Sequence, residues 1–253
     1  MSDLTTQLLL EIRRLVSINR LLSISNSATL NELTILANNP EATLVELRNK
    51  VISEVGVTME IINLANCTLR VGLGRKRELT VKDALNRIGV RGVRSAIILY
   101  KLQMLRTHVS ANWLREYQSN TEALLSIVTA SYLMSKELGL SQEDVELTMS
   151  LSIFYSVSVF AKIIAACSLQ IPCTQLAISS IRNPGAQVSS IILFVNNVHH
   201  GMVTLVEQMD NARNTHVPSL VAKAAWDLML NNKKVVDIEG HPFLRNEVLP
   251  KWQ

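Results

Sequence analysis

The sequence predicts an all-α fold made of two helical lobes. Glycine and proline are sparse, with nine and six residues among 253, and few helix breakers favour long helices over many short turns. Apolar residues recur at three- and four-residue steps along most of the chain, whereas no segment shows the sustained alternation of a strand bounded by turns. A chain of this length can bury a substantial core as one domain or as two closely packed ones.

The first lobe, residues 1–107, is predicted to hold five helices. The first covers residues 4–22, and the second ends at Asn38-Asn39-Pro40 because proline stops a helix. A short third helix precedes a fourth at residues 55–68. A loop at residues 70–79 then leads into a long helix that runs from Thr80 toward Arg106.

Three of these helices begin with a capping pattern, in which Ser or Thr is followed three residues later by an acidic residue. The side chains at the two positions satisfy N–H groups that the first helical turn leaves unpaired. The pairs are Thr29 with Glu32, Thr43 with Glu46, and Thr80 with Asp83.

The second lobe, residues 108–231, is predicted to hold five more helices. Gly139, Ser141, Pro172 and Pro184 mark breaks between them. The expected ranges are 110–138, 142–167, 173–182, 185–211 and 218–231. Residues 232–253 are expected to form an extended tail on the surface, and the two lobes together to form one unit.

The stretch from Leu151 to Ile171 has the length of a membrane span, with Lys162 as its one charge. It also contains four serines and lacks basic flanks, which favours a buried core helix over a transmembrane helix. Charged residues interrupt any signal-peptide core near the N-terminus. The three cysteines match no zinc or redox pattern. We therefore expect a cytoplasmic protein that does not engage a membrane.

Common enzyme signatures do not occur in the chain. There is no nucleophile elbow, no phosphate-binding Walker loop and no H-E-x-x-H zinc motif. His199 and His200 are adjacent, so on a helix they point about a hundred degrees apart. A metal site built from this pair and Asp210 is an alternative that the spacing does not favour, because helical ligands of one metal sit three or four residues apart.

Positive charge is concentrated in one segment. Between Arg70 and Arg106 ten basic residues face only Glu78 and Asp83, so this segment carries +8 and the rest of the chain −4. Such a surface could bind a phosphate-bearing ligand or an acidic partner. It could equally be a solvated face whose arginines pair with acidic residues of the second lobe. The candidate residues are Arg75, Lys76, Arg77, Arg87, Arg91, Arg94 and Lys101.

Three segments of the first lobe resemble the HDOD domain, an output module of bacterial signalling proteins. They read IINLANC at residues 61–67, LTVKDALNRIG at residues 79–89 and RSAIIL at residues 94–99. The likeness covers residues 15–105 well and continues more weakly beyond them. It departs from the family pattern at Val55-Gly56, where the family usually has Asp-Pro.

The second lobe resembles the related HD-type core of metal-dependent phosphohydrolases. That core holds a divalent cation with a histidine, a His-Asp pair and a later aspartate. The resemblance places Gln118 near the first ligand and Tyr155-Ser156 at the His-Asp pair. These neutral side chains make a poor site for a cation that activates water. The comparison therefore implies no metal, no catalytic residue and no cofactor.

Two functions remain open. The first is a non-catalytic signal-transduction module of HDOD type, which binds a signalling protein or a small anionic ligand through the basic helix face beside a groove between the lobes. The second is a divergent metal-dependent phosphohydrolase acting on nucleotides or cyclic dinucleotides, which rests on fold analogy. Nucleic-acid binding is a third alternative, which the 4% aromatic content does not favour.

Overall fold

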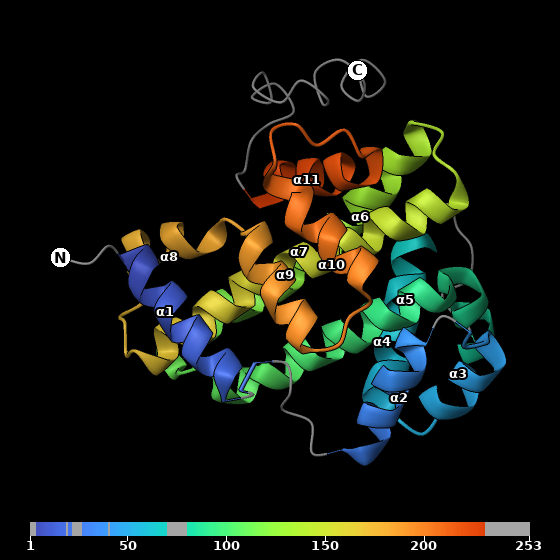
Figure 1. The fold of residues 1–253 in the computed structure, drawn as a ribbon, viewed down its shortest axis with the longest axis horizontal. Coiled ribbons are helices and arrows are strands. Elements are labelled where there is room, and N and C mark those ends of the chain that lie inside the picture. Colours follow the sequence, from blue (N-terminus) through green and yellow to red (C-terminus); the bar gives the residue numbers. More distant parts are fainter. Residues whose placement is uncertain (1–3, 19, 22–26, 40, 70–79, 231–253) are drawn as a thin grey trace.

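The computed structural model describes residues 4–18, 20–21, 27–39, 41–69 and 80–230. Within these residues the chain forms eleven α-helices, two short 3₁₀ helices and no strand (Figure 1). The predicted all-α class is confirmed. The loop at residues 70–79 and the tail at residues 232–253 lie outside the described residues.

The first part of the chain forms five α-helices, as expected. The first is shorter than the predicted range 4–22 and gives way to a turn after Ser17. The bounds are α1 Leu4–Ser17, α2 Ala28–Asn38, α3 Leu44–Val51, α4 Val55–Leu69 and α5 Val81–Met104, followed by the 3₁₀ helix η1 Leu105–His108.

Two of the three predicted caps are confirmed and one is wrong. Thr43 and Glu46 form a complete capping box at α3, and the Thr80 hydroxyl accepts from the Asp83 N–H at α5. At α2 the cap is Ser27, whose hydroxyl accepts from the Leu30 N–H at 3.2 Å. Thr29 lies inside the first turn, where its backbone is already helical and cannot serve as a cap.

Helix α5, predicted as one long helix, is kinked at Gly89. Gly89 has φ 63° and ψ −174°, a backbone conformation that is essentially restricted to glycine. The kink rotates the start of α5 relative to the rest. Arg87 lies before this kink, whereas Arg91, Arg94 and Lys101 follow it, so the four residues do not share the one continuous helix face that the sequence predicted.

The second part of the chain forms six α-helices rather than the predicted five. The predicted single helix 185–211 is wrong: the chain leaves the helix at Asn196, and Asn197 adopts a left-handed φ of 58°. His199 then caps a new helix by accepting from the Gly201 N–H. The bounds are α6 Ala111–Glu137, α7 Gln142–Ser168, α8 Gln175–Arg182, α9 Ala186–Val195, α10 His200–Glu207, the 3₁₀ helix η2 Gln208–Asp210, and α11 Val217–Leu230.

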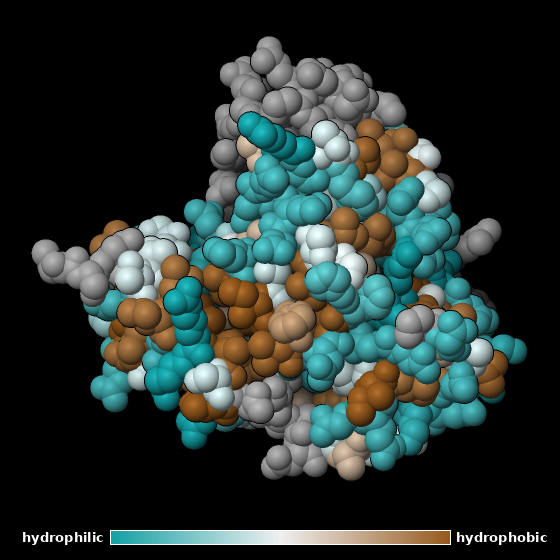
Figure 2. Space-filling model, viewed as in Figure 1, coloured by the Kyte–Doolittle hydropathy of each residue, from teal (hydrophilic) through white to brown (hydrophobic). Residues whose placement is uncertain are grey.

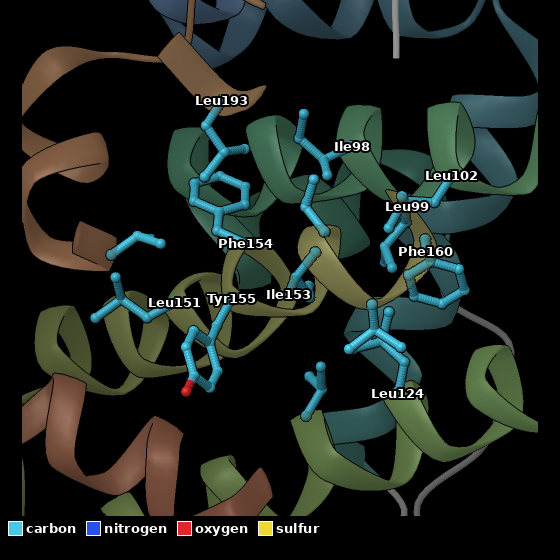
Figure 3. Packing of buried hydrophobic residues seen from close by; sticks show 14 of the residues in the cluster. Ile98, Leu99, Leu102, Leu124, Leu151, Ile153, Phe154, Tyr155, Phe160 and Leu193 are labelled. Atoms are coloured by element: carbon cyan, nitrogen blue, oxygen red, sulfur yellow. The ribbon is translucent and has the colours of Figure 1, made fainter. Parts of the chain in front are cut away.

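Helix α7 is the centre of the molecule. It packs against α5, α6, α9 and α11, and more lightly against α1, α8 and α10 (Figure 1). Figure 3 shows that its side chains point to opposite sides, with Phe154 toward Leu193 of α9 and Tyr155 in the other direction. Although α7 is long and apolar enough to span a membrane, 94% of its most apolar stretch is buried inside the protein. Its even apolarity reflects burial on all sides.

Helix α1 lies beside α7, α8 and α9, on the opposite side of the molecule from α2 and α3 (Figure 1). Its buried Glu11 accepts a hydrogen bond from Ser168 at the end of α7, at 2.6 Å, and pairs with Arg14. The first helix in the sequence thus packs on helices of the predicted second lobe. The boundary near residue 107 stays a prediction.

Apolar side chains gather on the surface between α1 and α9 (Figure 2). A groove of about 210 Å³ runs between these helices, lined mainly by Leu9, Val16, Val188 and Ile191. Arg13 is the one charged residue in its lining. Two further hollows lie along α5, and their linings contain more polar side chains than this groove does.

Candidate functional site

The basic residues predicted on α5 do not form one exposed stripe. Arg87, Arg91 and Arg94 are half-buried, and Lys101 is only 6% exposed. Each has different surroundings, and two of them line separate hollows. Arg75, Lys76 and Arg77 lie outside the described residues.

Arg91 and Arg94 make structural contacts. Arg91 pairs with Glu143 at the start of α7, with 2.6 Å between Nη2 and Oε1, as expected if arginines of the segment pair with acidic residues further along the chain. Arg94 donates from Nε to the Ala37 carbonyl at the end of α2. Burial, together with the charge of Arg91, lowers the pKa of Arg94 below its ordinary value. Both side chains hold helices together.

Arg87 lines a hollow of about 160 Å³ between α4, α5, α6 and α7, which we call the interlobe hollow. Its guanidinium Nη1 is buried and has no hydrogen-bond partner among the described residues. A buried donor without a partner is costly, at roughly 1–3 kcal/mol. The remaining lining residues are Leu64, Ile88, Gly92, Ser95, Tyr132, Gln142, Glu146, Met149, Ser150 and Ile153.

Small residues of α5 shape the interlobe hollow. A Cβ on Gly92 would lie 2.3 Å from the Ile88 Cβ, so only glycine fits there beside the kink. The Ser95 hydroxyl donates to Ser150 of α7 at 2.9 Å, which ties the two helices together where neither side chain is bulky. The kink and the small residues thus leave a space that the walls of α4 and α6 close.

The interlobe hollow offers both signs of charge. Glu146 of α7 accepts from the Gln142 amide at 3.1 Å, and its carboxylate lies 3.0 Å from where a Cβ on Gly89 would be. Arg87 offers a donor and Glu146 an acceptor, against an apolar wall that includes Leu64 and Ile153. Convergent polar groups in a mainly apolar concavity are typical of small-molecule sites.

Sequence reasoning found Arg87 but missed Glu146, Gln142 and the two serines of the interlobe hollow. These residues come from α5 and α7, and Ser95 and Gln142 are more than forty positions apart in the sequence, so no local spacing connects them. One signal was present in the sequence. Gly89 stands inside a long predicted helix, where a glycine suggests a kink or a close backbone approach.

The positions that the family resemblance assigned to metal ligands do not converge. Gln118 is exposed on α6, whereas Tyr155 and Ser156 are buried on α7. The Ser156 hydroxyl donates to the Ile153 carbonyl within its own helix. The buried face of α6 carries Glu116 and Asn120, whereas the position that the resemblance compares with the first metal ligand faces solvent. The assignment of these positions stays a prediction.

Tyr155 belongs to a hydrogen-bonded network around Asp210. Its hydroxyl donates to Asp210 Oδ1 at 2.6 Å, and Lys223 of α11 donates to the same oxygen at 2.9 Å. The Ala186 N–H, in the first turn of α9, donates to Oδ2 at 2.8 Å. One carboxylate therefore links α7, α9 and α11.

The chemistry of this network does not suit a divalent cation. Burial alone would raise the pKa of Asp210, but the donors Tyr155, Ala186 and Lys223 hold it below its ordinary value. Burial and the negative charge of Asp210 raise the pKa of Tyr155, so its hydroxyl stays protonated. Because the Asp210 carboxylate is paired with Lys223, it is not free to bind a cation, and the network contains no imidazole.

The histidine pair is separate from this network. His199 uses Nδ1 to accept from the Gly201 N–H, and both His199 and His200 are exposed. Within the residues that the structure describes, no three His, Cys, Asp or Glu side chains gather in a cluster suited to a metal. Asp210 faces Tyr155 and Lys223 instead.

Comparison with known proteins places the fold. No protein-family profile matches the sequence, and no curated protein matches it. A crystal structure of an HDOD domain protein of unknown function from Geobacter sulfurreducens aligns over 99% of this chain and 87% of its own, with a TM-score of 0.59 and 14% identity. A crystal structure named "putative phosphohydrolase", from Shewanella amazonensis SB2B, aligns over 91% of this chain and 83% of its own, with a TM-score of 0.55 and 15% identity.

These alignments establish the class of protein at the level of the fold. The chain has an all-α fold of HDOD and HD-like type, as the resemblance implied. The likeness extends through the whole chain, including the second part, where the sequence pattern was weak. At this identity it describes the fold alone, and function has to be argued from the site.

Proposed function

We propose that this chain is a non-catalytic regulatory module of HDOD type, acting in signal transduction in the bacterial cytoplasm and binding a small anionic ligand in the interlobe hollow. The observation that carries the proposal is Arg87, whose buried Nη1 has no partner among the described residues. An anionic acceptor bound there would satisfy it with a charge-assisted hydrogen bond. An acidic side chain of a signalling protein would do the same.

The position of the hollow supports a regulatory role. It lies between α5 and α7, which also meet through Arg91 with Glu143 and Ser95 with Ser150. A ligand that contacts Arg87 on one helix and Glu146 on the other would favour one arrangement of the two helices. Any ligand that binds one arrangement more tightly shifts the population toward it.

We propose that the chain is not a catalyst because the side chains at the positions compared with the His-Asp pair are already hydrogen-bonded within the protein. At the positions that resemblance assigns to metal ligands, Tyr155 is engaged with Asp210 and Ser156 with the Ile153 carbonyl. Asp210 is itself paired with Lys223. A cation that binds the Asp210 carboxylate would have to displace its three donors, Tyr155, the Ala186 N–H and Lys223.

The binding test is a thermal-shift screen of the purified chain against anionic probes, including nucleoside monophosphates, cyclic dinucleotides and pyrophosphate. A ligand of the interlobe hollow raises the melting temperature of the wild-type chain. The increase disappears in Arg87→Met and persists in Arg115→Met, a matched change at an exposed arginine of α6. A ligand that stabilises Arg87→Met as well as the wild type contradicts the proposed site.

The test of catalysis uses the same protein purified without chelator. Elemental analysis is expected to find no stoichiometric transition metal, and added Mn²⁺ is expected to give no hydrolysis of bis(p-nitrophenyl) phosphate or a cyclic dinucleotide. Hydrolysis that increases with metal content would favour the phosphohydrolase alternative. Variants of Asp210 and His199 would then test whether these residues bind the metal.

A further inference from the structure

A second hollow is lined by Lys101 of α5, which is the one charged residue among the described residues of its lining. This cavity, of about 730 Å³, is formed by α2, the second half of α5 and the turn that follows α9 (Figure 1). We call it the Lys101 cavity. It was not visible in the sequence, because its walls come from residues about 30, 100 and 195 positions along the chain.

Lys101 is a buried cation without a counter-charge. Its side chain is 6% exposed, and among the described residues it forms no hydrogen bond or ion pair. Burial lowers its pKa to about 8, which reflects the cost of keeping an ammonium group out of water. Its neighbours in the lining carry no carboxylate. Lysines are rarely buried this deeply unless paired.

The polar wall of the cavity contains a second unsatisfied group. Asn38 donates from Nδ2 to the Thr34 carbonyl at 2.9 Å, which fixes the orientation of its amide. Its Oδ1 is buried and has no partner among the described residues. The cavity therefore combines one unpaired acceptor with one unpaired ammonium. The other polar lining residues are Asn31, Thr34, Asn39, Asn196 and Asn197.

The lining also defines which ligands suit the cavity poorly. Ile35 and Val195 are its two apolar residues, and none of its lining residues is aromatic. A nucleobase would find no ring to stack on, whereas hydroxyl groups would meet amides that both donate and accept. The volume lies within the range of small-molecule pockets, roughly 300–1,000 Å³.

We propose that the Lys101 cavity binds a small hydroxylated anion, either a sugar phosphate or a sugar acid, whose anionic group pairs with Lys101 and whose hydroxyl donates to Asn38 Oδ1. Pairing the ammonium removes the one uncompensated charge in the cavity, and the hydroxyl satisfies the buried acceptor. Phosphate and carboxylate share this chemistry. The site is independent of the interlobe hollow and holds whether or not Arg87 binds a ligand.

Lysine labelling reports on the cavity directly. The full chain is reductively methylated near pH 8, and the modification of each lysine is quantified by mass spectrometry, with exposed Lys82 as the internal reference. We expect D-glucose 6-phosphate or D-gluconate at millimolar concentration to slow methylation of Lys101 about tenfold and to leave Lys82 unchanged. Whichever of the two protects identifies the anionic group. Neutral D-glucose is expected to give no protection.

Two variants complete the test by calorimetry with the protective probe. Lys101→Met removes the charge, and Asn38→Asp supplies the cavity with its own carboxylate, so each is expected to weaken binding at least about tenfold. Arg87→Met is expected to bind as the wild type does. The proposal is overturned if neither probe protects Lys101, if glucose protects it equally, or if Lys101→Met retains the affinity of the wild type.

Discussion

At the scale of single residues, the buried charge of Lys101 is expected to lower the stability of the free protein. The ammonium form is disfavoured in the folded state, where the pKa is about 8 instead of 10.5. Between these values the unfolded chain binds more protons than the folded chain, so stability rises with pH across this window. The full shift corresponds to about 3 kcal/mol, which is an upper value because water that enters the cavity would reduce it.

The first prediction concerns the change Lys101→Met, which keeps most of the side-chain volume and removes the charge. At pH 7 it is expected to raise the free energy of unfolding by about 1–3 kcal/mol. The gain should shrink between pH 8 and pH 10.5, as the wild-type lysine loses its proton. Urea unfolding at several pH values measures the difference between the two proteins, which cancels the titration of other groups. A gain that does not vary with pH would mean that packing, not charge, is responsible.

The second prediction concerns the pair formed by Tyr155 and Asp210. Tyr155→Phe and Asp210→Asn are each expected to lower the free energy of unfolding by about 1–3 kcal/mol, because both break a charge-assisted hydrogen bond. Their effects should overlap in the double variant, giving a coupling of about 1 kcal/mol. The control is Tyr132→Phe combined with Asp210→Asn, whose effects should add. Additive effects for Tyr155 and Asp210 would show that the two groups do not interact.

The residue scale is also where sequence reasoning was weakest. The sequence singled out Lys101 and Arg87 by their charge, but placed them on one surface. The structure puts them in two hollows because Gly89 turns the helix between them. The resemblance correctly indicated the fold, and the position that it compares with the first metal ligand, Gln118, is exposed on α6.

At the scale of the element, the kink in α5 depends on one glycine. Gly89 has a φ of 63°, and an added Cβ would lie 3.0 Å from Glu146 Oε2. Gly139, after α6, has a similar φ of 70° and nothing within 4 Å of its Cβ position. Substituting Gly139 therefore tests backbone strain alone, whereas substituting Gly89 tests backbone strain together with the contact to Glu146.

The third prediction is that Gly139→Ala costs about 1–2 kcal/mol from backbone strain alone, whereas Gly89→Ala costs more. Gly89→Ala should also displace Glu146 and so alter ligand binding in the interlobe hollow. Thermal unfolding of both variants and the thermal-shift screen described above measure the two effects. Equal costs, with unchanged ligand binding in both variants, would show that Gly89 has no part in shaping the hollow.

Local sequence patterns predicted some helix ends correctly and missed others. The capping box at Thr43 and the side-chain cap at Thr80 were predictable because the paired residues contact each other within one turn. The break between α9 and α10 was not. Asn196-Asn197 carries no proline or glycine, and it is held open partly by a long-range contact from the Asn196 amide to the Leu21 carbonyl, at 3.3 Å. Tertiary contacts of this kind cannot be read from local sequence.

At the scale of the whole molecule, one central helix, α7, packs against helices of both predicted lobes. Helix α7 contacts α5 of the first lobe as well as α6, α9 and α11 of the second. Helix α1, although first in the sequence, packs on α7, α8 and α9. The sequence predicted that α7 is a buried core helix, because its apolar stretch contains four serines and lacks basic flanks. It did not predict that α1 crosses to the far side, because an amphipathic helix does not specify its partner.

This arrangement leads to the last prediction, that the described helices unfold as one cooperative unit. Phe154 of α7 is fully buried and lies toward Leu193 of α9 (Figure 3). Phe154→Ala is expected to lower the free energy of unfolding by about 3–5 kcal/mol. Phe194→Ala, at a phenylalanine that is 63% exposed on α9, should cost less than about 1 kcal/mol.

Native-state hydrogen exchange locates the effect of Phe154→Ala. If α7 joins the two lobes into one unit, slowly exchanging amides of α4 and α5 should lose protection by the same free energy as those of α6 and α11, because all of them exchange through the same global opening. Loss of protection confined to α6, α7 and α11, with α4 and α5 unchanged, would show two independently stable lobes. The boundary near residue 107 would then be a true domain boundary, and a ligand in the interlobe hollow would act by joining two folding units.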